Sequence, residues 1–230
     1  MTTLSLIIPA AGSGVRMGRD IPKPFIEIKG RAILQRTIDK FINIQGLRQI
    51  IVVASAQYIP LVNKLVSGYS RSALQVSVVE GGSERQYSIY NALKHVDEKA
   101  ELIAVHDAVR PFVKPEKIMK CIKSANETGA AILGIPVSDT IKKVNTEFFV
   151  ESTLDRSVLW QIQTPQVFKT EVLIKAYEKA IKAGFAGTDD SSLVENTGIK
   201  VRVIEGGVNN FKITYPIDLK IAEQLIEETS

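Results

Sequence analysis

The sequence predicts an α/β fold in which a mostly parallel, Rossmann-like sheet has helices on both faces. Short apolar runs rich in β-branched residues alternate with amphipathic stretches, and this alternation fills most of the 230 residues. A hydrophobic content of 45% is ordinary for a chain with a full core. The length and the lack of any linker or repeat favour a single domain spanning residues 1–230.

The apolar runs set the expected order of the elements. Buried strands are expected at 4–9, 49–55, 74–81, 102–107 and 130–136. Helical patterns lie between them at 31–44, 58–69, 84–96 and 115–129. Pro115 stands where a first-turn proline belongs, and Gly129 stands where a glycine ends a helix.

The segment 137–158 breaks this rhythm. It is polar and rich in Thr and Val, so we expect a hairpin or arm that reaches out of the domain. Helices near 169–183 and 189–197, a strand at 200–206 and a helix from about 216 complete the chain. In sheets of this kind the ligand lies beyond the carboxyl ends of the strands, so the loops after the strands are the place to look for a site.

Composition narrows the classes of partner. A net charge of +4, from 29 basic and 25 acidic residues, favours anionic small molecules, and the scattered Lys and Arg residues predict no nucleic-acid surface. The single cysteine, Cys121, excludes an internal disulfide framework and a Cys-based zinc site, and its helical pattern places it in the core. The N-terminal apolar run is too short for a signal peptide or a membrane span, so a cytoplasmic protein without a membrane partner is expected.

The loop after the first strand, "PAAGSGVRMGRDIPKPF", is small, flexible and cationic. Glycine lets a ligand approach the backbone, and bare N–H groups at such a turn suit anions. Arg16 adds a planar fork for phosphate oxygens, and Lys23 adds a point charge whose backbone is restricted by Pro22 and Pro24. The alternative is a mobile surface turn with solvated charges. The P-loop pattern is absent, and Met17 stands where the dinucleotide pattern needs its third glycine.

The third expected strand ends in "EGGSERQYS". Gly81 and Gly82 would let a flat ring approach the backbone, and Ser83 is a possible N-cap for the following helix. Arg85 and Ser88 complete the set of polar residues here. The alternative is a glycine-rich turn with a helix cap and no ligand.

The fourth expected strand ends in "VHDAVRPF", which places Asp107 at a carboxyl end near the phosphate loop. Mg²⁺ takes one or two carboxylates together with phosphates and water, so Asp107 is a candidate magnesium ligand. A histidine-based metal site is excluded because the chain has only two histidines and His95 ends a helix. His106 is therefore interpreted as structural.

A third cation, Lys212, lies in "NNFKIT", where an extended backbone would point it away from Phe211 and Ile213. No nucleophile-and-base pair emerges from the sequence. Phosphoryl and nucleotidyl transfers need none, because positioning and charge neutralisation supply most of the catalysis.

The chain resembles the 2-C-methyl-D-erythritol 4-phosphate cytidylyltransferase family. The resemblance rests on eight pieces in the family's order: "PAAGSGVRMG", "PK" at 22–23, "GGSERQYS", "VHDAVRP", "PVSDTIK", "LDRSVLWQIQTPQVF", "GTDDSSLVE" and "NNFKITYPIDL". It implies a reaction in non-mevalonate isoprenoid biosynthesis that joins CTP and 2-C-methyl-D-erythritol 4-phosphate, with Mg²⁺, and releases pyrophosphate.

The resemblance also implies roles for individual residues. The catalytic cations would be Arg16, Lys23 and Lys212, and the Mg²⁺ ligand would be Asp107. The cytidine pocket would be formed by Ala10, Ala11, Gly12, Gly82, Ser83 and Ser88. The sugar phosphate would be held by Arg110, Thr140, Arg156, Thr164 and Asn209. In the family the arginine at 156 comes from a partner's arm, which makes 137–158 a dimerisation arm and implies a homodimer.

Three positions depart from the family pattern. Pro24 stands where glutamine is common, Ser83 where aspartate is common, and Asn209 where an acidic residue often touches the substrate hydroxyls. Two other functions stay open. One is a sibling cytidylyltransferase that activates ribitol 5-phosphate, which "PAAG" and "PVSDT" disfavour. The other is a regulatory nucleotide-binding module, which the two lysines and Asp107 disfavour.

Overall fold

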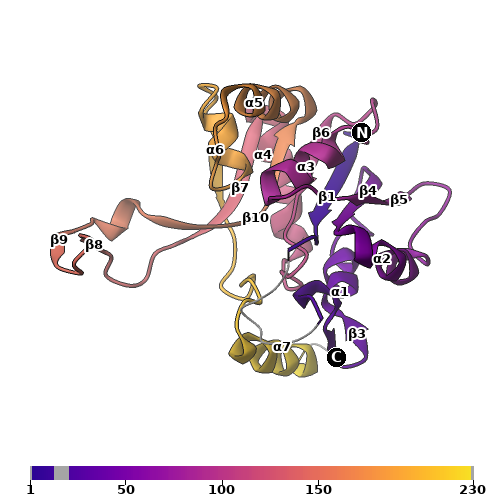
Figure 1. Ribbon diagram of the computed structural model, residues 1–230, viewed down its shortest axis with the longest axis horizontal. Helices are drawn as coiled ribbons and strands as arrows, with labels where there is room; N and C mark the ends of the chain where they lie inside the picture. The colour runs from indigo at the N-terminus through magenta and orange to yellow at the C-terminus, as the bar shows by residue number, and fades with distance from the viewer. Residues whose placement is uncertain (1, 13–20, 229–230) are drawn as a thin grey trace.

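The computed structural model describes residues 2–12 and 21–228. Within these residues, seven strands form one sheet in the order β11-β7-β10-β6-β1-β4-β5 (Figure 1). Their bounds are β1 Leu4–Pro9, β4 Leu47–Ala54, β5 Gln75–Glu80, β6 Leu102–Val105, β7 Ala130–Pro136, β10 Trp160–Lys169 and β11 Arg202–Glu205. β10 runs antiparallel to β6 and β7, and the other pairs are parallel. The mostly parallel sheet is thus confirmed.

Helices cover both faces of the sheet because successive strand residues point to opposite sides. On one face, Leu6 and Ile8 of β1 pack in a cluster with α1 Ile33–Asp39, α2 Ile59–Val66 and α4 Pro115–Thr128. On the other face, Ile7 packs in a cluster with helices α3 Arg85–Leu93, α5 Thr170–Ala183 and α6 Asp190–Glu195. The expected burial is confirmed for most of β1, β4 and β6. It is wrong for the strand expected at 74–81, because β5 lies at the edge of the sheet and its residues are exposed or only partly buried.

A third, smaller hydrophobic cluster packs helix α7 against strand β2. Helix α7, Pro216–Glu228, contributes Leu219 and Ala222, which pack with Ile28 of strand β2, Glu27–Ile28. Ile213, fully buried just before α7, belongs to the same cluster and donates its backbone N–H to the Val109 carbonyl at 3.0 Å. This cluster fixes the backbone on either side of Lys212.

The expected helix at 31–44 is wrong at both ends. Lys29 and Gly30 adopt positive φ angles of 49° and 70°, so the chain turns tightly and β3, Arg31–Ala32, pairs with β2. The helix begins at Ile33 and ends at Asp39. The expected helix at 58–69 is likewise shorter, since α2 ends at Val66 after a 3₁₀ turn over Ala56–Tyr58.

Strand β10 has no counterpart among the expected strands. Pro165 and alternating glutamines argue against a central strand, because proline cannot donate to the ladder. The structure accommodates Pro165 with a register shift between Gln163 and Gln166 against β7, and the strand continues on both sides. The expected signals of α4 are confirmed, since Pro115 is its first residue and Gly129 ends it with a φ of 92°.

The segment 137–158 forms an arm, as expected. Strands β8 Lys142–Val144 and β9 Val150–Thr153 pair as a hairpin whose strand residues are all exposed, and the 3₁₀ turn Arg156–Val158 follows. Figure 1 shows β8 and β9 standing well away from the sheet. As for membranes, the described helices include none with the length and apolarity needed for a bilayer span.

Cys121 is expected to be unreactive in the folded protein. Its side chain is fully buried on α4, and burial raises the pKa of the thiol to about 12. An aromatic disulfide reagent at about pH 8 should therefore label the thiol only after denaturation, because the thiolate is the nucleophile. Rapid labelling of the native protein would contradict the core placement.

Candidate active site

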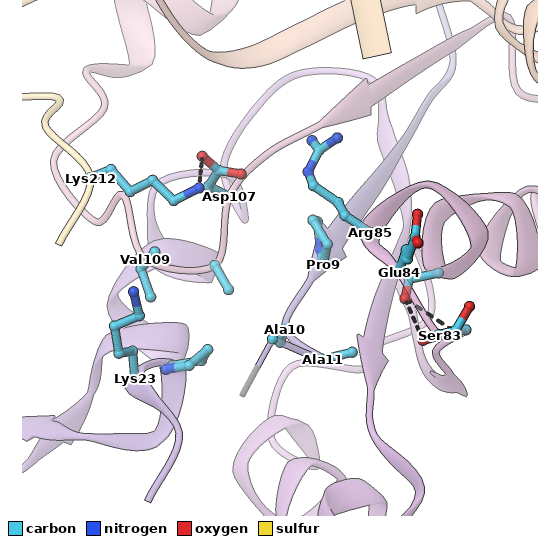
Figure 2. Close-up of a pocket in the computed structure, with 15 residues that line it drawn as sticks. Pro9, Ala10, Ala11, Lys23, Ser83, Glu84, Arg85, Asp107, Val109 and Lys212 are labelled. Atoms are coloured by element: carbon cyan, nitrogen blue, oxygen red, sulfur yellow. Dashed lines mark hydrogen bonds and ion pairs between the residues drawn. The ribbon is translucent and has the colours of Figure 1, made fainter. Parts of the chain in front are cut away.

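A cleft of about 510 Å³ lies at the carboxyl edge of the sheet, where β1, β5 and β6 end. Figure 2 shows residues from these three strand ends facing a common space, with Lys23 and Lys212 on the side opposite Ser83 and Glu84. Nine of the predicted site residues line it: Ala10, Ala11, Gly12, Lys23, Gly82, Ser83, Ser88, Asp107 and Lys212. The structure thus brings together side chains from five separate parts of the sequence.

Lys23 is presented to the cleft by a short rigid turn. It begins the 3₁₀ helix Lys23–Phe25, whose preceding residue, Pro22, holds an extended ψ of 142°. Phe25 is buried, and its ring lies 5.3 Å from the Tyr58 ring, which anchors the turn to the core. The lysine itself is only 8% exposed. Arg16, its predicted companion, lies outside the described residues.

Asp107 is a buried acidic residue that lines the cleft. Its Oδ2 atom lies 3.3 Å from Nζ of Lys212 and accepts a 3.0 Å hydrogen bond from Nε of Arg110. Burial raises the pKa of the carboxyl, but Lys212, Arg110 and Arg85 outweigh it and hold the pKa well below its ordinary value. Asp107 is therefore an ionised carboxylate at neutral pH.

A buried hydrogen-bond chain fixes the backbone of Asp107. The Asp107 N–H donates to Oγ1 of Thr164 at 3.0 Å, and that hydroxyl lies 3.0 Å from Nδ1 of His106. The opposite ring nitrogen, Nε2, lies 3.0 Å from the carbonyl of Arg110, which can only accept. Burial lowers the pKa of His106 to about 4, so the ring is neutral, with Nε2 donating and Nδ1 accepting. The structural role expected for His106 is confirmed.

The residues present fit a magnesium ion bound together with a nucleotide. Among the described side chains, no group of three or more His, Cys, Asp or Glu residues could hold a metal alone. The contacts of Arg110 and Lys212 with Asp107 are both on Oδ2, and Oδ1 accepts no hydrogen bond within the part of the chain described. One ionised carboxylate with a free oxygen suits Mg²⁺, which completes its shell with phosphates and water.

The glycine wall of the cleft is closely packed. The Gly82 N–H donates to Oγ of Ser88 at 3.0 Å, and a Cβ on Gly81 would lie only 2.8 Å from Cβ of Ala11. Ser83, a possible N-cap from the sequence, does not cap the next helix, because Glu84 occupies the N-cap position and makes no side-chain cap bond. Ser83 is exposed and lines the cleft instead.

Arg85 also lines the cleft, although the sequence analysis assigned it no role. It is the first residue of α3, lines the cleft, and donates from Nη2 to Oδ2 of Asp190 at 2.6 Å. The signal lay in two quoted motifs, "GGSERQYS" and "GTDDSSLVE", but their pairing requires a contact between residues 105 positions apart.

Comparison with known proteins shows the family of the chain. The family model for 2-C-methyl-D-erythritol 4-phosphate cytidylyltransferase matches residues 4–228. The chain belongs to this family. A relative of that name from Caldanaerobacter subterraneus subsp. tengcongensis is 43% identical over 225 residues, which is 98% of this chain and 99% of the relative. Another from Clostridioides difficile is 42% identical, covering 96% of this chain and 93% of the relative.

Solved structures with the family's fold also match. A crystal structure of 4-diphosphocytidyl-2C-methyl-D-erythritol synthase from Anaerococcus prevotii matches with a TM-score of 0.87 at 32% identity, covering 98% of this chain and 96% of the other. The 2-C-methyl-D-erythritol 4-phosphate cytidylyltransferase of Thermus thermophilus matches with a TM-score of 0.80 at 31% identity, covering 99% and 100%.

The residues expected from the sequence to hold the sugar phosphate lie in three places. Arg110 and Thr164 are buried beside Asp107, and Nη1 of Arg110 donates to the carbonyl of Asn210 at 2.7 Å. Asn209 lines a separate pocket of about 80 Å³. The other two, Thr140 and Arg156, lie on the arm rather than among the cleft-lining residues, and Nη1 of Arg156 donates to the Ser138 carbonyl at 2.7 Å.

Replacing Gly82 with alanine is expected to distort the glycine wall. The new Cβ would lie 2.5 Å from Cβ and 3.0 Å from the carbonyl carbon of Tyr87, so the loop or α3 must shift. We expect a stability loss on the order of 1–3 kcal/mol, as for other overpacked sites, together with weaker CTP binding. Thermal unfolding and calorimetry measure the two effects. Gly68→Ala is the control, since its Cβ meets nothing within 4 Å, and equal behaviour of the two variants would contradict the prediction.

Proposed function

We propose that this protein transfers the cytidylyl group of CTP to 2-C-methyl-D-erythritol 4-phosphate in non-mevalonate isoprenoid biosynthesis. The products are 4-(cytidine 5′-diphospho)-2-C-methyl-D-erythritol and pyrophosphate. The single observation that carries the proposal is the convergence of Lys23, Lys212 and Asp107 in one cleft opposite a glycine-lined wall. Family membership supplies the identity of the two substrates.

The chemistry needs charge neutralisation rather than a general base. A phosphate-monoester oxygen of the alcohol phosphate attacks the α-phosphorus of CTP, the new P–O bond forms, and the bond to the pyrophosphate oxygen breaks. The second pKa of a phosphate monoester is about 6, so the nucleophile is already ionised at neutral pH. This fits a cleft without a nucleophile-and-base pair, in which Lys23 and Lys212 meet the charge that builds on the α-phosphate.

The walls of the cleft suit the two ends of the nucleotide. Ala10, Ala11 and Gly12 continue directly from β1 and leave their backbone accessible to phosphates or a ribose. Gly82 and Ser88 form the facing wall, where a small flat base can approach the backbone. Arg16 is proposed as the second cation on the α-phosphate, from its place in the family motif.

Asp107 would hold Mg²⁺, because its Oδ1 faces no competing donor in the described chain. When bound, the ion supplies positive charge to the phosphates of CTP. The chain's own part is to keep Asp107 ionised and in place, which Arg110 and Thr164 do through the contacts given above.

The arm supports a homodimer in which each protomer completes the other's site. Its large apolar side chains stand in solvent, with Phe148 86%, Phe149 67% and Val158 72% exposed. Exposed apolar side chains gathered on a protruding hairpin mark a protein interface. Arg156 and Thr140 would then reach the sugar phosphate in a partner's cleft, since they lie away from their own.

Pyrophosphate release tests the proposed reaction. We expect release with CTP, Mg²⁺ and 2-C-methyl-D-erythritol 4-phosphate, and little release when ribitol 5-phosphate replaces the alcohol phosphate. ATP is the nucleotide control, because the wall of Gly82, Ser83 and Ser88 is proposed to contact the pyrimidine base of CTP. Preferred turnover of ribitol 5-phosphate would assign the sibling activity, and absence of any release would overturn the enzyme assignment.

A further inference from the structure

The motif "GTDDSS", residues 187–192, has no role in the proposed chemistry, yet it contains a fully buried acid. Asp190 has an exposed fraction of 0% at the start of α6. Its Oδ2 accepts from Nη2 of Arg85 at 2.6 Å, and its Oδ1 accepts from the hydroxyl of Tyr177 at 2.5 Å. Both carboxylate oxygens are therefore committed, one to the cleft residue Arg85 and one to the core.

The position of Asp190 is fixed from two sides. The neighbouring Asp189 caps α6 by accepting from the Ser192 N–H at 2.9 Å, and it also accepts from Nε2 of Gln166 on β10 at 2.6 Å. Oε1 of the same glutamine accepts from the Ser191 N–H at 3.0 Å. Hydrogen bonds from β10 thus fix the position of Asp190, and Asp190 can in turn restrict the side chain of Arg85.

The guanidinium of Arg85 is bonded to Asp190 through Nη2, and its other donors are available for a ligand. Its side chain is 36% exposed, and Figure 2 shows the guanidinium extending from the start of α3 toward the side of the cleft that holds Asp107. The donors Nε and Nη1 make no hydrogen bond within the described chain. Burial lowers the pKa of Arg85, but the charge of Asp190 outweighs it and the net pKa is raised, which keeps the cation permanently charged.

We propose that Arg85 is a further nucleotide-contacting residue of the cleft and that Asp190 is a positioning residue that acts through it. The proposal rests on the proposed function, since it takes CTP as the ligand. Arg85 lines the cleft together with Gly82 and Ser83, and its guanidinium extends toward the side that holds Asp107, where the phosphates of CTP are proposed to lie. Its N–H donors would therefore bind phosphate oxygens of the nucleotide.

The ion pair explains why an acid is buried here. A free arginine side chain must lose rotamer freedom when it binds a ligand, and anchoring it beforehand reduces that cost. A buried carboxylate needs a compensating charge, and Arg85 supplies it. The pair therefore preorganises the guanidinium before the nucleotide arrives.

Steady-state kinetics of Arg85→Lys and Arg85→Ala test the proposal. Loss of a hydrogen bond to a charged group corresponds to a rise in KM for CTP on the order of 10–100-fold for Arg85→Ala. KM for the alcohol phosphate should change less than twofold. Arg85→Lys keeps the charge that Asp190 needs but lacks the planar fork, so it should show a smaller rise in the same constant. This variant decides the matter if Arg85→Ala does not fold.

The single variant Asp190→Asn and its combination with Arg85→Lys test the role of Asp190. Asp190→Asn keeps the shape and the contact to Tyr177 but weakens the hold on Arg85, so KM for CTP should rise and calorimetric CTP affinity should fall. In Arg85→Lys/Asp190→Asn the two effects should be less than additive, because both act through one guanidinium. Full additivity would show that Asp190 does not act through Arg85.

Gln86→Ala is the matched control. Gln86 follows Arg85 on α3 and bonds to the loop before α6. It donates to the Phe185 carbonyl at 2.9 Å and accepts from the Gly187 N–H at 3.1 Å. It does not line the cleft. The variant should lower the melting temperature and leave KM for CTP unchanged. Wild-type turnover of CTP is measured first, so failure there counts against the proposed function. A normal KM for CTP in folded Arg85 variants overturns this inference alone.

Discussion

Lys23→Ala is expected to lower turnover roughly 10²–10³-fold with both substrates saturating, by analogy with the loss of one oxyanion donor. The reason lies in how the lysine is held. It is 8% exposed, follows Pro22, and starts a turn anchored by the buried Phe25. A cation that is already fixed and largely shielded from water stabilises developing phosphate charge more than a solvated one does.

Two further variants separate charge from packing. Lys23→Gln keeps most of the side-chain volume and removes the charge, so it should lose nearly as much turnover as alanine. Lys64→Ala removes an exposed lysine on α2, away from the cleft, and should retain wild-type kcat. Single-turnover rates with saturating CTP measure the effect on chemistry directly. Near-normal turnover by folded Lys23→Gln would refute the assigned role.

The fold could be predicted where the local signal and the tertiary environment agree. The strands β1, β4 and β6 are largely apolar, and burial on both faces requires that pattern. Strand β10 could not be predicted in this way. Its first three residues, from Trp160, are exposed and its later ones are buried, so its composition changes along its length, and Pro165 interrupts its ladder. Only pairing with β6 and β7 makes it a strand.

The candidate site likewise contains residues that could be predicted from the sequence and residues that could not. Ala10, Gly82 and Asp107 could be predicted because each follows an expected strand, and the carboxyl ends of parallel strands meet at one edge. The Arg85–Asp190 ion pair could not be predicted, because the two residues are 105 positions apart and neither segment contains a signal for the contact. Ser83 was a possible N-cap of α3, but the helix starts one residue later and leaves the serine facing the cleft.

A mixture of two inactive variants, Lys23→Ala and Arg156→Ala, is expected to regain activity. Arg156 lies on the arm, where Nη1 donates to the Ser138 carbonyl, and it does not line the cleft of its own protomer. If it serves a partner's cleft, a heterodimer of the two variants contains one cleft with an intact Lys23 and an intact Arg156 from the other chain. Arg156→Ala alone should lose turnover or affinity for the alcohol phosphate, since a phosphate-binding cation is removed.

The amount of recovery follows from the pairing. Random association in a two-fold symmetric dimer gives about half heterodimers with one complete cleft each, so co-expressed chains should reach roughly a quarter of wild-type activity per chain. Mixing Lys23→Ala with Lys212→Ala is the control, because both lysines act in their own cleft and no complete cleft can form. Activity per dimer, measured beside sedimentation of each variant, distinguishes the cases. Recovery in the control, or no recovery in the test pair when both chains are dimeric, would show that Arg156 does not act across the dimer.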